Sequence, residues 1–343
     1  MTTGYSSLNS VPVIHARGLV RTFRGRGRGA KEVHAVRGVD IDVEAGEVVG
    51  FLGPNGAGKT TTLRMLTTLL EPTAGEASVA GHDLRTDPVG VRRNIGYVPQ
   101  SGSSLPIARV GEELTDHAAL YGIPTAVARA RGEELFARLD LEGVWTRKVE
   151  SLSGGQRRRL DIAKGLVHQP PLVFLDEPTT GLDPQSRANL WVHVADLRDK
   201  AGVTVFLTTH YLEEADVLCD RILVIDHGKL VAVGTPDELK RRVSGDAVLL
   251  RLADPTHVPD ATRLAAALPD ADEPGVDGDV VHVRVPNGAS ALPGLLRELD
   301  RAGVPLAAVE VRRPTLDDVF LSLTGRSLRD AETPAETELV GAR

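Results

Sequence analysis

Short, almost continuous apolar runs recur along much of the chain, separated by polar segments that contain glycine. Apolar runs of this length without alternation are typical of strands buried on both faces of a parallel sheet. We expect such strands at Val48–Leu52, Leu172–Leu175, Val203–Thr208 and Ile222–Asp226. The intervening segment Lys59–Leu70 carries Leu63, Leu66 and Leu70 at helical spacing. The pattern therefore predicts an α/β fold built on a parallel sheet.

Other parts of the chain have different patterns. The segments Val13–Phe23 and Val33–Val43 resemble β-strands, whereas residues 108–170 are mostly helical by pattern. A second α/β pattern begins near residue 240. It has expected strands at Ala247–Leu252, Val280–Val285 and Leu306–Val311, helices at Ala261–Leu268 and Ala291–Ala302, and a last helix after Thr315. This order is compatible with a small ferredoxin-like unit.

These patterns divide the chain into four parts. We expect a flexible tail at 1–10, a large α/β domain at 11–240, a small C-terminal α+β accessory domain at 241–326 and a disordered tail at 327–343. Both tails are polar and lack the apolar residues that form a core.

Composition narrows the class of protein. The 343 residues carry a formal net charge of −7, which argues against a nucleic-acid partner, because most such domains are basic. The one cysteine, Cys219, excludes an intrachain disulfide framework and fits a reducing cytoplasm. We find neither a signal peptide nor an apolar run approaching the ~20 residues that cross a bilayer.

A glycine-rich turn between an expected strand and an expected helix matches the pattern G-x-x-x-x-G-K-[ST]. Its residues are Gly53, Pro54, Asn55, Gly56, Ala57, Gly58, Lys59 and Thr60, followed by Thr61. Glycines let backbone N–H groups point at phosphate oxygens, and the following helix presents its positive end to the same anion. Lys59 is predicted to reach the β- and γ-phosphates of a nucleotide, and the Thr60 hydroxyl to bind Mg²⁺.

Two carboxylates directly follow a buried strand. Asp176 and Glu177 come after Leu172–Leu175, and side chains at this end of a parallel strand face the crevice where ligands bind. Taken alone, such a pair is more often a surface cap of a helix. Beside a phosphate-binding loop, Asp176 is predicted to hold Mg²⁺ and Glu177 to polarise the attacking water.

Further motifs distinguish between the classes of phosphate-loop protein. The pentapeptide Leu152-Ser153-Gly154-Gly155-Gln156 precedes a helix-like segment. Gln100 ends Gly-Tyr-Val-Pro-Gln, Asp183 ends Gly-Leu-Asp, and His210 ends Thr-Thr-His. With the two preceding motifs, and in this order, residues 12–240 resemble the ABC ATPase family. The resemblance implies a P-loop NTPase core with an antiparallel β subdomain and a helical subdomain.

The resemblance also implies a mechanism in which two copies of the chain sandwich two ATP molecules. The signature of each copy, Ser153, Gly154, Gly155 and Gln156, would close over the ATP held by the other, with Asp183 nearby. It implies Glu177, His210 and Gln100 as catalytic residues, and Thr60, Gln100 and Asp176 around Mg²⁺. It also suggests Phe23 as the aromatic ring that stacks on adenine, although a packed core phenylalanine is an equally good interpretation. The Arg- and Gly-rich stretch after Phe23 is interpreted as a solvated loop.

Two segments resemble a narrower group, the daunorubicin-resistance type of ABC ATPase. They are Arg157-Arg158-Arg159-Leu160-Asp161 and Arg313–Leu321. This resemblance implies a homodimeric subunit on the cytoplasmic face of the membrane that drives export through a separate permease. An importer subunit and a soluble ABC ATPase without a transport role remain as alternatives, because the catalytic motifs are shared.

Overall fold

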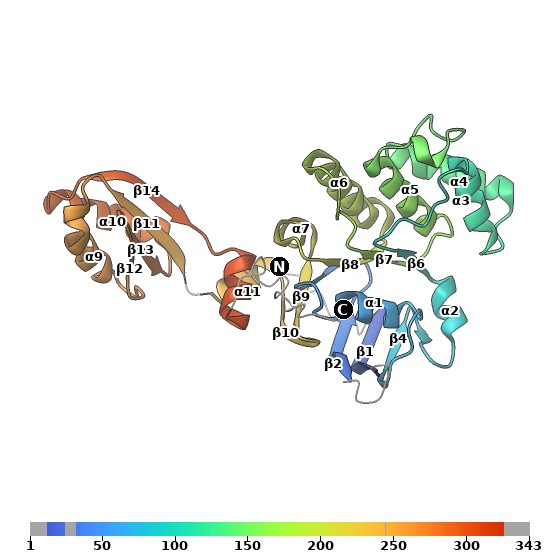
Figure 1. Ribbon diagram of the computed structural model, residues 1–343, viewed down its shortest axis with the longest axis horizontal. Helices are drawn as coiled ribbons and strands as arrows, with labels where there is room; N and C mark the ends of the chain where they lie inside the picture. The colour runs from blue at the N-terminus through green and yellow to red at the C-terminus, as the bar shows by residue number, and fades with distance from the viewer. Residues whose placement is uncertain (1–11, 25–31, 244, 326–343) are drawn as a thin grey trace, which may run out of the picture. The chain divides into compact units, whose positions relative to one another are not determined.

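The computed structural model describes residues 12–24, 32–243 and 245–325 (Figure 1). The described residues fall into two compact units, divided between Pro236 and Asp237. The predictions for the tails at 1–10 and 327–343 lie outside the described residues. No helix in the described ranges combines the length and the apolar character needed to span a membrane.

The first unit is organised around a six-stranded sheet in the order β10-β9-β3-β8-β7-β6 (Figure 1). All neighbouring strands are parallel except β10, which pairs antiparallel with β9 at one edge. The strands are β3 (Val48–Leu52), β6 (Ile95–Val98), β7 (Leu172–Asp176), β8 (Thr204–Thr209), β9 (Arg221–Asp226) and β10 (Lys229–Gly234). Every residue of β3, β7 and β8 is buried, which confirms the prediction of doubly covered parallel strands.

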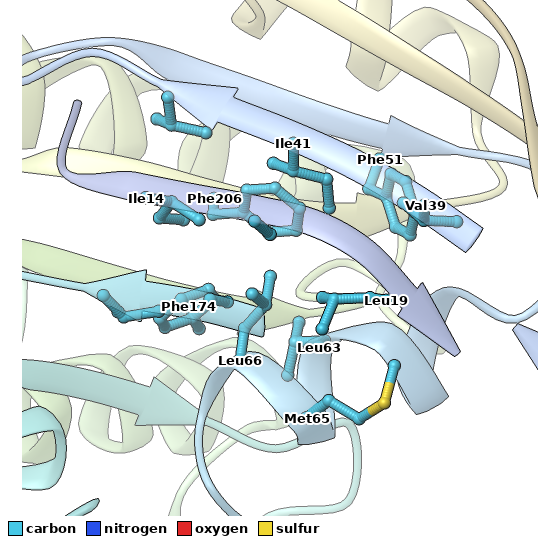
Figure 2. Close-up of a cluster of buried hydrophobic side chains, with 14 of the residues drawn as sticks. Ile14, Leu19, Val39, Ile41, Phe51, Leu63, Met65, Leu66, Phe174 and Phe206 are labelled. Atoms are coloured by element: carbon cyan, nitrogen blue, oxygen red, sulfur yellow. The ribbon is translucent and has the colours of Figure 1, made fainter. Parts of the chain in front are cut away.

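A four-stranded antiparallel sheet in the order β2-β1-β4-β5 forms the second layer of this unit. Its strands are β1 (Ile14–Phe23), β2 (Val33–Val43), β4 (Ala74–Val79) and β5 (His82–Asp83). Figure 2 shows side chains of β1 and β2 packed with Phe51, Phe174 and Phe206 of the parallel sheet. Burying an aliphatic or aromatic side chain of this size contributes roughly 1.5–3 kcal/mol. Because α1 lies in the same cluster, this packing fixes the loop that precedes the helix.

The helices of the first unit lie between its strands in sequence. They are α1 (Lys59–Leu66), α2 (Pro88–Arg93), α3 (Val110–Ala119), α4 (Thr125–Arg138), α5 (Gly154–Leu166), α6 (Pro184–Ala201) and α7 (Leu212–Leu218), with a 3₁₀ turn at Val149–Ser151. The short helix α8 (Pro236–Arg241) follows β10 and begins at the division between the two units. α3 and α4 pack together and against α5, which forms the expected helical subdomain (Figure 1).

The helix expected at Lys59–Leu70 is shorter than predicted, because α1 ends at Leu66. Thr67 and Thr68 follow in a turn. Thr68 takes a left-handed φ of 61°, and the amide of Leu70 bonds back to the carbonyl of Arg64. Leu70 still packs against the core, from a turn instead of a helix.

The second unit has a four-stranded sheet in the order β12-β13-β11-β14, with antiparallel neighbours throughout. Its elements are β11 (Asp246–Leu252), a 3₁₀ turn (Pro255–His257), α9 (Val258–Ala266), β12 (Gly275–Asp277), β13 (Val280–Val285), α10 (Gly288–Arg301), β14 (Leu306–Arg312) and α11 (Leu316–Thr324). From β11 to β14 this is the β-α-β-β-α-β order of a ferredoxin-like unit. The short strand β12 was not predicted. The last helix begins with the expected capping box between Thr315 and Asp318.

Candidate functional site

The glycine-rich loop follows β3 at the carboxyl end of the parallel sheet, and two of its glycines leave no room for a side chain. A Cβ on Gly53 would lie 2.3 Å from the carbonyl oxygen of Ile225, and one on Gly58 would lie 2.5 Å from that of Ala35. Gly58 also has a φ of 107°, which side chains disfavour. Glycine at these two positions therefore lets the loop lie close against its neighbours.

The loop leads into a helix N-terminus that is suited to an anion. Gly58 is the N-cap of α1 and has no side chain to accept from the first-turn amides, which lack partners within any helix. Lys59 is buried, and its Nζ donates to the carbonyl oxygens of Gly53 at 2.7 Å and Pro54 at 3.2 Å. The ammonium group thus lies inside the curl of the loop, where a phosphate would meet it together with the helix dipole.

Asp176 brings a second set of oxygen atoms to this loop. It ends β7, and its Oδ1 accepts hydrogen bonds from the hydroxyls of Thr60 at 3.1 Å and Thr208 at 2.7 Å. A carboxylate beside a hydroxyl fits Mg²⁺, which usually takes one or two carboxylates together with phosphate oxygens and water. The described residues contain no cluster of three or more His, Cys, Asp or Glu that would hold a metal alone.

Glu177 has a strained backbone and a buried side chain. Its φ is 43°, a left-handed value that costs a residue with a side chain on the order of 1–3 kcal/mol. Its amide donates to the carbonyl oxygen of Thr208 at 3.1 Å, which holds this conformation. Its Oε2 accepts from Gln100 Nε2 at 2.9 Å and from Thr180 Oγ1 at 3.1 Å. The strained backbone of Glu177 therefore places its carboxylate against Gln100, which follows β6.

Two basic side chains complete the surroundings of this carboxylate. Lys59 Nζ lies 3.4 Å from Glu177 Oε1, and His210 Nδ1 lies 3.2 Å from Oε2. Burial alone would raise the pKa of Glu177, but the contact with His210 and the charge of Lys59 outweigh it and lower the pKa to about 2. The ionised carboxylate therefore stabilises the fold above its unfolded pKa near 4.5, and this contribution is lost as the pH falls towards 2.

The signature residues lie at the start of α5. Ser153 Oγ accepts from the amide of Gln156 at 3.1 Å, and the Gln156 side chain accepts from the amide of Ser153 at 3.1 Å. Asp183 caps α6 in the same way, accepting from the amide of Ser186 at 2.9 Å. A Cβ on Gly155 would lie 3.0 Å from Ser186 Oγ, so the two helix N-termini are neighbours. Ser153, Gly154 and Asp183 are exposed or partly exposed, which leaves them open to a second molecule.

Phe23 is the end of β1, and 38% of its surface is exposed. The guanidinium of Arg21 lies 4.8 Å from the centre of its ring. Because the ring is this exposed, the alternative of a packed core phenylalanine is wrong.

The structure brings the residues expected for hydrolysis together. The carboxylate of Glu177 contacts Gln100 and His210 and lies close to the ammonium group of Lys59. Sequence reasoning missed Thr180 and Thr208, whose hydroxyls bond the two carboxylates. The available signal was their position, since they are adjacent to the acidic and histidine motifs and threonine hydroxyls commonly support buried carboxylates.

Comparison with known proteins agrees with this geometry. Residues 36–180 match the family model described as ABC transporter, and residues 234–324 match the model described as ATP-binding protein DrrA1-3-like, C-terminal domain. The chain is 44% identical to the daunorubicin resistance ATP-binding protein DrrA3 of Streptomyces coeruleorubidus, over 87% of this chain and 93% of that protein. It is 42% identical to the daunorubicin/doxorubicin resistance ATP-binding protein DrrA of Streptomyces peucetius, over 96% of this chain and 98% of that one.

Solved structures lead to the same family. The dimeric ATP-binding cassette MJ0796 bound to ADP and Pi superimposes with a TM-score of 0.59 at 26% identity. The match covers 65% of this chain and 98% of that one. The chain is therefore an ATPase that belongs to the ABC transporter family, in the group of daunorubicin- and doxorubicin-resistance ATP-binding proteins.

Proposed function

We propose that this chain energises the export of antibiotics or other hydrophobic drugs through a separate integral-membrane permease. The observation that carries the ATPase part is the convergence of Lys59, Gln100 and His210 on the Glu177 carboxylate. The export part is supported by the relatives, which are named as drug-resistance proteins and match this chain along almost their whole length. An importer subunit or a soluble ABC ATPase is less well supported, because residues 234–324 match a domain of the resistance group.

ATP binding would rearrange the contacts of Lys59. Its ammonium group now neutralises Glu177 and donates to the loop carbonyls, and the γ-phosphate would compete for the same donors. Mg²⁺, held by Thr60, Gln100 and Asp176, would supply charge that stabilises the phosphate oxygens. Glu177, released from Lys59, would then orient and polarise the attacking water, with His210 contacting the γ-phosphate.

The groups that this mechanism needs lie at two separate places on each copy. The phosphate loop lies before α1, whereas the exposed N-termini at Ser153 and Asp183 belong to α5 and α6. Two copies, each closing its signature helix over the nucleotide of the other, would give each phosphate a second positive helix end. Hydrolysis removes the γ-phosphate that both copies bind, so it would reopen the dimer and pass the motion to the permease.

The remaining assignments are part of the same proposal. Residues 11–240 would form the nucleotide-binding domain, with Thr61 in the phosphate site and Phe23 stacking on adenine. Residues 241–326 would be an accessory domain. The permease would place the chain at the cytoplasmic face of the membrane, and no nucleic-acid partner is expected.

Replacing Ser153 by arginine should prevent closure of two copies without preventing nucleotide binding. The new side chain adds positive charge at an exposed helix N-terminus and removes a cap that contributes about 1 kcal/mol. We expect Ser153→Arg in the Glu177→Gln background to bind ATP but to sediment as a monomer, whereas Glu177→Gln alone dimerises with ATP. Thr125→Arg, at the exposed start of α4, is the control and should leave dimerisation intact. ATP-dependent dimers of the Ser153→Arg chain would rule out this role of the signature.

A further inference from the structure

One buried arginine on the signature helix bonds the backbone of two separate loops of the hydrolytic site. Arg158 lies on α5 and is 7% exposed. Its Nε donates to the carbonyl oxygen of Pro178 at 2.8 Å and its Nη2 to that of Asp176 at 2.9 Å. Its Nη1 donates to the carbonyl oxygen of Pro99, at the end of β6. The guanidinium thus joins the strand ends of β6 and β7 to the helix that begins at the signature.

Two of these carbonyls flank Glu177. The peptide groups of Asp176 and Pro178 lie on either side of the residue whose φ is 43°. With the carbonyl on each side fixed by the same rigid group, the backbone has little freedom to relax from this conformation. The direction of the Glu177 side chain therefore depends on Arg158, although the two side chains belong to different elements.

The third carbonyl immediately precedes Gln100, and the same helix also binds the segment after it. Asp161 is three residues beyond Arg158 on α5, and its Oδ1 accepts from the amide of Ser103 at 3.3 Å and the hydroxyl of Ser104 at 3.2 Å. Both flanks of Gln100 are thus bonded to side chains of α5. Gln100 donates to Glu177 across the space between these two loops.

The chemistry of the site requires an arginine. Burial lowers the pKa of Arg158, while the neighbouring carboxylates of Asp161 and Asp176 oppose the shift. Charge-assisted hydrogen bonds to backbone carbonyl oxygens offset the cost of burying the charge. These oxygens are not protonated near neutral pH, so they remain acceptors. Three acceptors in different directions match the planar fork of a guanidinium, whereas the ammonium group of lysine is a compact point charge.

We propose that Arg158 is a positioning residue for ATP hydrolysis, which sets Gln100 and Glu177 relative to one another through the carbonyls of Pro99, Asp176 and Pro178. Because Arg158 is on α5, it also links this arrangement to the helix whose N-terminus would bind the nucleotide of the second copy. The inference rests on the proposed role of Glu177 in polarising water. It differs from that role, since the hydrogen bonds of Arg158 go to backbone carbonyl oxygens.

The test measures kcat and ATP affinity separately in Arg158→Gln and Arg158→Lys of the full chain. A displacement of about 1 Å in a reacting group can cost about 100-fold in rate, so we expect kcat to fall about 10- to 100-fold in Arg158→Gln. A smaller loss is expected in Arg158→Lys, with the ATP dissociation constant within about 3-fold of the parent in both. The control is Arg131→Gln, because Arg131 also donates to a backbone carbonyl, that of Val167, away from these loops. It should leave kcat unchanged.

A merely structural role would give a different result, with ATP affinity and thermal unfolding temperature falling together with kcat. That result, or unchanged kcat in both variants, would overturn the proposal. If Arg158→Gln does not fold, the kcat and affinity of Arg158→Lys decide by the same criteria.

The Glu177→Gln background separates this inference from the proposed function. If Arg158 acts through Glu177, adding Arg158→Gln to Glu177→Gln should not slow single-turnover hydrolysis further. If Arg158→Gln lowered the single-turnover rate as much in this background as in the parent chain, Arg158 would act by another route. That result would overturn this inference and leave the proposed function intact. Normal turnover in Glu177→Gln itself would instead reject the proposed role of Glu177, and this inference with it.

Discussion

Glu177→Gln is expected to lower ATP turnover by about 100-fold or more, while the chain binds ATP at least as tightly as before. The amide keeps the shape of the side chain but removes the charge that would polarise the attacking water. It also removes the ion pair in which Lys59 Nζ lies 3.4 Å from Glu177 Oε1. The phosphates would then no longer compete with a carboxylate for Lys59. The measurements are phosphate release at saturating ATP and the dissociation constant of a fluorescent ATP analogue.

The control for this variant is Glu47→Gln, which also breaks an ion pair of a carboxylate. Glu47 precedes β3 at the end opposite the phosphate loop, and its Oε2 lies 2.7 Å from Arg221. We expect this variant to keep turnover within about 2-fold, because the pair is partly exposed and such pairs contribute little. Turnover near the parent value in Glu177→Gln would exclude Glu177 as the catalytic carboxylate.

Lys59→Ala is expected to weaken ATP binding by about 10- to 100-fold, the usual contribution of hydrogen bonds to a charged group. The same change leaves Glu177 buried without its lysine partner. Breaking a buried ion pair by removing one side typically costs about 3 kcal/mol of stability, so the unfolding temperature should also fall. Calorimetric titration with ATP and thermal unfolding measure the two effects separately.

A double variant distinguishes these two effects of Lys59. Adding Glu177→Gln to Lys59→Ala removes the uncompensated carboxylate, so the unfolding temperature should recover. ATP affinity should remain weak, because the phosphates still lack the lysine. Affinity equal to that of the parent in Lys59→Ala would contradict the assignment of the phosphate-binding loop.

The sequence predicts four of the six strands of the parallel sheet, misses β6 and β10, and predicts the turns less well. β3 and β13 have the predicted bounds, because an apolar run limited by glycine or polar residues fits a strand with few alternatives. α1 ends early, because the left-handed turn at Thr68 is a local feature that leucine spacing does not reveal. The three-residue strand β12 was missed, since so short a segment has no period to recognise.

The same distinction applies to the site. The phosphate loop and Glu177 are predictable, because the chemistry restricts the residue types and their order. The roles of Thr180, Thr208 and Arg158 depend on which strand ends become neighbours in the sheet. Arg158 stands between two other arginines in sequence, and only the direction in which α5 presents it shows that it is the buried one of the three.

We propose above that this ATPase drives a membrane permease carried on another chain. The most direct test is to recover the tagged chain from solubilised membranes of its native host and to identify what remains bound by mass spectrometry. We expect a multi-spanning membrane protein in roughly equal amount, as in a symmetric assembly. Recovery of the chain alone, or with ribosomes or DNA, would leave the ATPase chemistry intact and contradict the transport function.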